Sequence, residues 1–121
     1  GGGAMRVMVI VHASPESEAD AMPPAFLASM MAAMDRFNDE LSAAGVLVMA
    51  HGLAPTAHGR RIHFDGGSLE ERCGPFAPAA AQIAGFWLWD VPDMDTALAW
   101  ARRCPPPMPG PCSIEVRPVH G

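Results

Sequence analysis

Short apolar or alternating segments predict five β-strands in this chain. In residues 6–13 the odd and the even positions form two opposite faces, and both faces are apolar, which indicates a central strand. Residues 61–65 have a single apolar face and are expected nearer a sheet edge. The other strands are 46–53, 86–89 and 114–119, and residues 68–72 are a candidate partner for 61–65 beyond the turn at Asp65-Gly66-Gly67.

The most apolar run of the sequence, Phe86-Trp87-Leu88-Trp89, is bounded by Gly85 and Pro92. A run this short between turn-forming residues favours a buried strand over a helix. We expect it to be the centre of the core and one wall of any pocket. Trp87 and Trp89 are expected on opposite faces, one in the core beneath a helix and the other facing a cavity, where it would stack on a flat ligand.

Apolar residues at helical spacing predict two helices. The first is predicted over 25–44, after Pro23-Pro24 and before a C-terminal cap at Gly45. Its apolar stripe consists of Phe26, Met30, Met34, Phe37 and Leu41. The second begins at the N-cap Asp93, buries Ala97, Leu98, Trp100 and Ala101, and places Arg102 and Arg103 in its last turn. Residues 14–24, 54–60 and 104–111 are expected to be loops, and 14–24 to act as a flap.

This order of elements predicts an α+β fold in which two helices cover one face of a mostly antiparallel sheet. The second face of the sheet would then be apolar and exposed. The residues expected there are Met8, Ile10, Leu47, Met49, Trp87 and Trp89, and His51 shares the alternation phase of Leu47 and Met49. A patch of this size needs a cover, and a two-fold homodimer is the simplest one.

Composition narrows the class of protein. The 121 residues suffice for one domain, assigned to 5–120, and residues 1–4 resemble a remnant of cloning. The net charge of −5, with no run of basic residues, argues against a nucleic-acid partner. No apolar stretch has the length of a membrane span and no secretory signal is recognisable, so a cytoplasmic protein without a membrane partner is expected.

Motifs for metals and cofactors are missing from the sequence. Cys73, Cys104 and Cys112 lack the spacing of a zinc site and are expected to be free thiols. His12, His51 and His63 are not at ligand spacing either, so no metal is predicted. The absence of phosphate-loop, dinucleotide-binding and nucleophile-elbow motifs favours a protein that needs no cofactor.

Several short motifs, in this order, resemble the YCII-related family and in particular its DGPF branch. They are Phe37-Asn38-Asp39-Glu40-Leu41, Ala44-Gly45-Val46-Leu47, Gly74-Pro75-Phe76, Gly85-Phe86, Asp90-Val91, Ala99-Trp100-Ala101, Arg103-Cys104-Pro105 and the final strand 114–119. The resemblance implies a ferredoxin-like subunit and a dimeric α/β barrel with a shared cavity. It does not fix an activity, because one fold hosts many functions.

Histidines are the first candidates for chemistry, since they titrate near neutral pH. His51 and His12 each end a predicted strand and are the candidate catalytic residues. The resemblance implies a Glu at the position of His51, within Ala50-His51-Gly52-Leu53, and an imidazole would keep the capacity for proton transfer. The alternative is a hydrogen-bonded or half-exposed structural histidine.

The residues expected to contact the substrate are Arg61, Met49, Trp87, Trp89, Phe76 and Cys73. Arg61 suits an anion if it points inward; the alternative is an ordinary surface arginine. Cys73 stands where the branch motif has Asp, so it is either a lost structural cap or a thiol at the pocket mouth. The resemblance further implies a His-Asp pair at the positions of Met34 and Cys104, which this chain lacks.

Two functions remain open. One is a small cofactor-independent enzyme of the isomerase, lyase or cyclase type, which acts on a flat, largely apolar molecule with His51 as general acid/base. The other is a non-catalytic binding or regulatory module, either a sensor or an associate of a sigma factor, as the branch resemblance implies.

Overall fold

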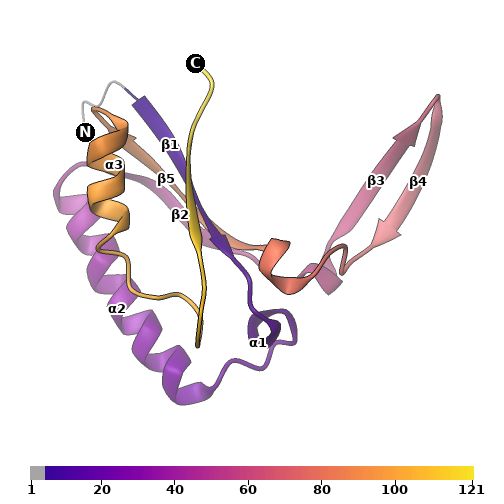
Figure 1. The fold of residues 1–121 in the computed structure, drawn as a ribbon, viewed down its shortest axis with the longest axis horizontal. Helices are drawn as coiled ribbons and strands as arrows, with labels where there is room; N and C mark the ends of the chain where they lie inside the picture. The colour runs from indigo at the N-terminus through magenta and orange to yellow at the C-terminus, as the bar shows by residue number, and fades with distance from the viewer. Residues whose placement is uncertain (1–4) are drawn as a thin grey trace.

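The structure is a computed structural model that describes residues 5–121. The prediction about a cloning remnant at residues 1–4 lies outside the described residues. The elements form a mixed α+β fold around an antiparallel sheet, as predicted (Figure 1).

The main sheet has four strands in the order β2-β5-β1-β6, and each neighbouring pair is antiparallel. The strands are β1 (Met5–His12), β2 (Leu47–Gly52), β5 (Ile83–Val91) and β6 (Ile114–Pro118). The apolar run lies in β5, between β2 and β1, so its prediction as an interior strand is confirmed.

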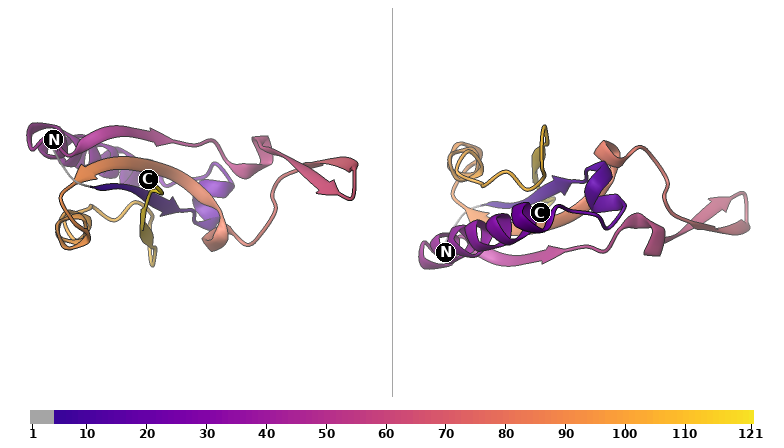
Figure 2. Two further views of the ribbon diagram at one scale, coloured as in Figure 1. Left: turned by 90° about the horizontal axis from the view of Figure 1, so that it is seen from above. Right: turned by 90° about the horizontal axis from the view of Figure 1, so that it is seen from below.

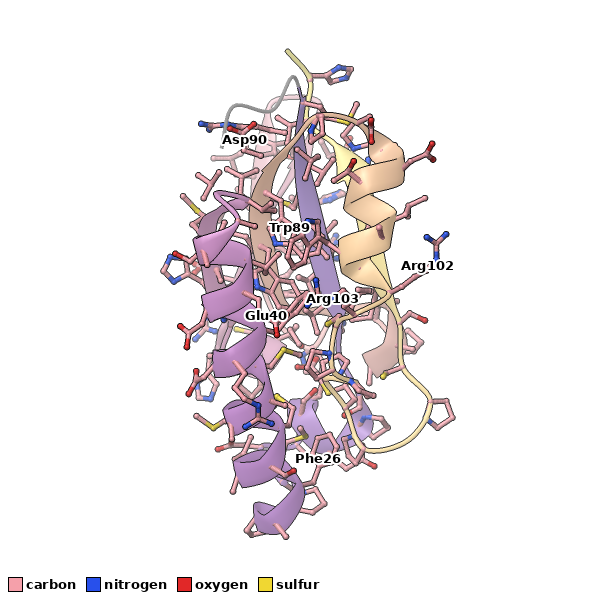
Figure 3. All side chains as sticks on the ribbon, turned by 90° about the vertical axis from the view of Figure 1, so that its left-hand side faces the viewer. Phe26, Glu40, Trp89, Asp90, Arg102 and Arg103 are labelled. Carbon is pink, nitrogen blue, oxygen red and sulfur yellow. The ribbon has the colours of Figure 1, made fainter. Side chains whose placement is uncertain are left out.

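Helices α2 (Pro24–Ala43) and α3 (Met94–Ala101) lie side by side on one face of this sheet, with Trp89 between them (Figure 3). The predicted caps are present. Gly45 adopts φ +72° after α2, and the N–H of Val46 donates to the Leu41 carbonyl at 2.9 Å. Asp93 accepts from the Thr96 N–H at 2.8 Å, and hydrogen bonds from Thr96, first from its side chain, lower the pKa of Asp93.

Arg102 and Arg103 lie just beyond α3 and not in its last turn as predicted, because the helix ends at Ala101. Arg103 reaches across to α2, where it pairs with Glu40, and its Cζ lies 4.5 Å from the centre of the Trp100 ring (Figure 3). This arginine therefore joins the ends of the two helices.

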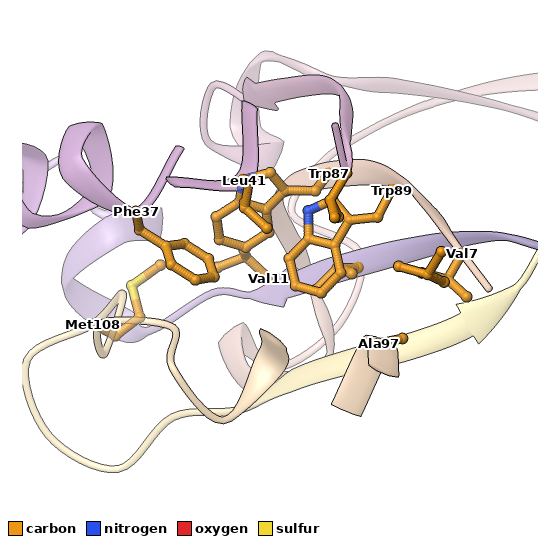
Figure 4. Packing of buried hydrophobic residues seen from close by; sticks show 11 residues of the cluster. Val7, Val11, Phe37, Leu41, Trp87, Trp89, Ala97 and Met108 are labelled. Carbon is orange, nitrogen blue, oxygen red and sulfur yellow. The ribbon is translucent and has the colours of Figure 1, made fainter. Parts of the chain in front are cut away.

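The buried core fills the space between the sheet and the helices (Figure 4). Odd-numbered residues of β1 and β5 supply its sheet side, and Phe37 and Leu41 supply the α2 side. The prediction that Trp87 and Trp89 face opposite ways is wrong. Residues two apart in a strand share a face, and both indoles pack in this core with ring centres 5.9 Å apart.

The predicted alternation of β2 is also wrong in part. A register irregularity between Leu47 and Met49 places Leu47 opposite Trp89, on the helix side, and Met49 opposite Leu88, on the open side. His51 stays on the open side, opposite Phe86. The open face therefore consists of Met8, Ile10, Met49, Phe86 and Leu88, without Leu47 or either tryptophan of β5.

Strands β3 (Arg60–Asp65) and β4 (Ser68–Cys73) pair with each other in a separate two-stranded sheet. The turn Asp65-Gly66-Gly67 and the pairing of 61–65 with 68–72 are confirmed, with Gly66 at φ +53° and Gly67 at φ +92°. The expected place near the edge of the main sheet is wrong: this hairpin, called the arm below, projects away from it (Figures 1 and 2).

Three short helical turns connect these parts: α1 (Pro15–Glu18), η1 (Thr56–His58) and η2 (Ala79–Ala81). Helix α1 lies within the segment predicted as a loop. Ser14 and Ser17 form a capping box there, which supplies partners for the first backbone N–H groups of the turn.

Candidate functional site

A cavity of about 250 Å³ lies between α2, the ends of β2 and β5, and the proline-rich loop after α3. We call it the α2 cavity. Its walls are mainly apolar and include Val11, Met30, Met34, Ala50, Trp87 and Met108. Asn38 and His51 are the hydrophilic residues among those that line it, and His51 lies at its edge because its side chain leaves β2 on the open side of the sheet. An apolar concave site with a few polar groups is typical of a small-molecule pocket.

Asn38 is held in a fixed orientation by a core residue. Its Oδ1 accepts a hydrogen bond of 2.7 Å from Nε1 of Trp87. Because the oxygen of the Asn38 amide faces Trp87, the NH₂ group of the same amide must point away from Trp87. Nδ2 donates to no other described residue, so two N–H donors remain for a ligand in the cavity.

His51 lies at the rim of the α2 cavity, near the C-terminal end of β2. Its ring centre is 5.9 Å from that of Phe86, its cross-strand neighbour, and the side chain is exposed. No side-chain hydrogen bond orients the imidazole among the described residues. His51 therefore has access to solvent for proton exchange, but it has no carboxylate partner among residues 5–121.

His12 is placed differently and does not line the α2 cavity. Its Nδ1 is 3.1 Å from the Ala80 carbonyl oxygen, and its Nε2 is 3.5 Å from a carboxylate oxygen of Glu115. The protonated imidazole would donate to both acceptors. These contacts join β1 to η2 and β6, so they give His12 a structural role at the end of the sheet.

The other predicted substrate contacts do not converge on one cavity. Trp87 lines the α2 cavity, whereas Trp89 is fully buried and its Nε1 has no hydrogen-bond partner in the part of the chain that the structure describes. Met49 lies on the open face of the sheet. Arg61 and Phe76 line a second cavity of about 450 Å³ at the base of the arm, called the arm-base cavity, and Cys73 is exposed at the end of β4.

Met34 and Cys104, the positions that the resemblance assigns to a His-Asp pair, cannot transfer protons at neutral pH. Met34 contributes a thioether to the cavity wall. Burial, and secondarily the neighbouring Cys112, raises the pKa of the Cys104 thiol to about 12. His51 is thus the titratable residue at the edge of the α2 cavity.

Sequence reasoning missed Asn38 and Met108. Asn38 is adjacent to the apolar stripe of α2 but not part of it, and Met108 lies in a loop whose path carries no periodic signal. Only the fold brings both residues to Trp87. A polar residue beside the buried stripe of a helix was the one available clue to Asn38.

Within residues 5–121 no cluster of three or more His, Cys, Asp or Glu side chains is arranged to hold a metal ion. In the same range no helix combines the length and the apolar character needed to cross a bilayer.

Comparison with known proteins places the chain in a family. The YCII-related domain matches residues 5–120, which is nearly all of the chain. The chain belongs to the YCII-related family. A similar protein is an uncharacterized protein of Rhizobium meliloti (strain 1021), 36% identical over 76 residues. That match covers 63% of this chain and 61% of the relative, and it leaves the activity open.

Proposed function

We propose that this chain binds a small, largely apolar molecule in the α2 cavity and transforms it without a cofactor, as an isomerase, lyase or cyclase. The observation that carries the proposal is the composition of the cavity: thioether, indole and aliphatic walls, with Asn38 as a hydrophilic side chain and His51 at the edge, on the open side of β2. A volume of about 250 Å³ suits a compact ligand.

The proposed roles follow from the geometry. The NH₂ group of Asn38, oriented by Trp87, donates to a carbonyl-type oxygen of the ligand and stabilises the negative charge that develops there. His51, at the exposed rim, removes and returns a proton as general acid/base. Proton transfer adjacent to a carbonyl group is the reaction that these two residues support together.

We also propose a homodimer with a ferredoxin-like subunit and a shared barrel. The strand order β2-β5-β1-β6 and the two helices on one face support the subunit fold. The apolar open face, which includes Met8, Met49 and Leu88, supports a second copy as its cover. Such a dimer would also cover the His51 side chain, which is exposed in the single subunit.

Acetophenone is a suitable probe for binding, because it has an apolar body and one carbonyl oxygen. With ¹³C-labelled methionine methyl groups, we expect saturable shifts at Met30, Met34 and Met108, which line the cavity. Met34→Trp should fill the cavity and abolish the shifts. The matched control is Met31→Trp, on the exposed side of the same helix, which should leave them unchanged. Equal binding by both variants would place the ligand elsewhere.

Catalysis is tested with the same probe in D₂O, by following exchange of the methyl protons next to the carbonyl group. We expect the protein to accelerate exchange, and His51→Ala to reduce this acceleration about 10²-fold or more while the methionine shifts persist. Full exchange activity in His51→Ala would exclude the assigned base.

A second candidate function is a non-catalytic module that binds a small molecule as a sensor or in association with a sigma factor. It is favoured by Met34 and Cys104 at the positions of the family His-Asp pair and by the lack of a group that orients His51. Saturable binding of apolar carbonyl compounds without any acceleration of exchange is the result that this candidate predicts.

A further inference from the structure

The arm-base cavity concentrates positive charge in an acidic protein. The chain has a net charge of −5 and eight basic residues, all of them arginines. Arg60 and Arg61 line this cavity together with His58, and Arg72 stands directly opposite Arg61 in the hairpin. None of the residues that line the cavity is acidic. The local charge is therefore opposite to that of the whole chain.

Arg61 is held in place by an aromatic ring and not by a carboxylate. Its Cζ lies 4.1 Å from the centre of the Phe76 ring, a distance at which a guanidinium group packs over the ring face. The guanidinium group of Arg61 forms no hydrogen bond or ion pair with any other described residue. Packing over a ring leaves the N–H groups at the edge of the guanidinium plane available for an oxyanion.

The surrounding charges are already paired or do not reach Arg61. Arg72 pairs with Glu70 at 3.1 Å, which lowers the pKa of Glu70. Glu18 directs its carboxylate to Thr56, whose N–H donates to it at 2.8 Å and whose hydroxyl donates to the second oxygen. Since like charges directly opposite each other destabilise a strand pair, an anion at Arg61 would offset the repulsion from Arg72.

The cavity also has a fixed floor and apolar walls. A Cβ at Gly74 would lie 1.9 Å from the Thr56 carbonyl oxygen, so the turn that carries Phe76 is packed directly on the backbone of η1. Leu53 and Ile83 line the cavity with largely exposed apolar side chains. A ligand there meets a guanidinium fork and an apolar surface together.

We infer that the arm-base cavity is a binding site for a small organic carboxylate, with Arg61 as the residue that binds the carboxylate group and Leu53 and Ile83 as the contacts of its apolar body. This site shares no lining residue with the α2 cavity and does not rest on the proposed function. The ligand should be an anion because Arg61 can bind a carboxylate group through two parallel hydrogen bonds. It should be organic because the apolar walls favour a ligand with an apolar body over an inorganic anion.

Sodium benzoate is the probe for this site, titrated into the ¹⁵N-labelled full chain at constant ionic strength. We expect saturable amide shifts centred on residues 53–61 and 81–83, with a dissociation constant of roughly 1–10 mM. Benzyl alcohol, which has the same ring without the charge, and inorganic phosphate, which has the charge without the ring, should each bind at least about tenfold more weakly. Phosphate binding as tight as that of benzoate would overturn the organic-anion assignment.

Arg61→Met should weaken benzoate binding about tenfold or more, and Arg61→Lys should recover only part of it, because an ammonium group cannot form the planar fork. Arg102→Met removes the same charge from an exposed position beyond α3 and should leave the dissociation constant unchanged. Equal losses in Arg61→Met and Arg102→Met, or shifts outside residues 53–61 and 81–83, would overturn the inference. If Arg61→Met fails to fold, benzoate and benzyl alcohol are compared in the unmodified protein. Equal binding of the two would then overturn the inference.

Discussion

At the scale of single residues, Trp87 and Trp89 form a matched pair that differs in one interaction. Both are buried in the same core, but the indole N–H of Trp87 donates to Asn38, whereas that of Trp89 has no acceptor among the described residues. An unsatisfied buried donor costs about 1–3 kcal/mol, and a satisfied one contributes about 1 kcal/mol. Equal substitutions at the two positions should therefore have unequal effects.

We predict that Trp89→Phe is more stable than Trp87→Phe by about 1–3 kcal/mol, because the first substitution removes an unpaired donor and the second leaves Oδ1 of Asn38 unpaired. Chemical denaturation of both variants gives the difference in the free energy of unfolding. Trp87→Phe should also shift the side-chain amide resonances of Asn38. Equal stabilities would mean that the Nε1 of Trp89 does have a partner in solution.

The three thiols differ in their surroundings. Cys73 and Cys112 are exposed, whereas burial raises the pKa of Cys104 to about 12. Because the thiolate is the reactive form, a raised pKa leaves Cys104 protonated across the neutral range. We predict that a disulfide reagent at pH 8 labels two thiols rapidly and the third only after denaturant is added.

Cys73→Ser and Cys112→Ser should each remove one rapidly reacting thiol, and Cys104→Ser should remove the slow one. Three equally fast thiols would contradict the burial of Cys104. The same experiment bears on Cys73 as a thiol near a pocket: labelling there should be blocked by benzoate only if the arm-base ligand reaches the end of β4.

At the scale of elements, the hairpin arm depends on a contact that only glycine permits. A Cβ at Gly74 would collide with the backbone carbonyl of Thr56, whereas a Cβ at Gly52 would meet nothing within 4 Å. We predict that Gly74→Ala lowers the free energy of unfolding by about 1–3 kcal/mol, the usual cost of overpacking. Gly52→Ala, the control, should change it much less. Similar midpoints in denaturant for both variants would show that the base of the arm adjusts freely.

Sequence patterns predicted the elements better than their relative placement. The stripe of α2 and the apolar run of β5 are local periodic signals, and both elements formed as expected. The irregularity in β2 and the detachment of the arm are not local, since they depend on which strand lies next to which. The sequence of β3 shows one apolar face but not whether a sheet or a partner covers it.

The candidate site shows the same limit. His51 was predicted from its place at the end of a strand, and it does line the α2 cavity. Arg61 and Phe76 were predicted as contacts of the same ligand, but they lie in the arm-base cavity, because the arm turns away from the main sheet. Asn38 needed the fold, since only packing brings α2 against Trp87.

At the scale of the whole molecule, apolar side chains are exposed on two surfaces. On the open face of the sheet Met8 is 36% and Met49 is 42% exposed, next to Phe86 and Leu88. On the arm, Phe64 is 74% and Leu69 is 68% exposed, and the two pair across one face of the hairpin. A two-stranded hairpin alone in water is marginally stable, and soluble monomers rarely expose contiguous apolar patches of this kind.

We predict a homodimer, seen by light scattering as twice the chain mass of 12.8 kDa. Met49→Glu places a charge on the open face, on its edge strand β2, and should shift the protein to monomer at micromolar concentration, because an unpaired charge is costly to bury. Met31→Glu introduces the same charge on the outer side of α2, where Met31 is 55% exposed, and should remain dimeric. An unmodified protein that stays monomeric, or two variants that dissociate equally, would mean that the open face does not form the dimer interface.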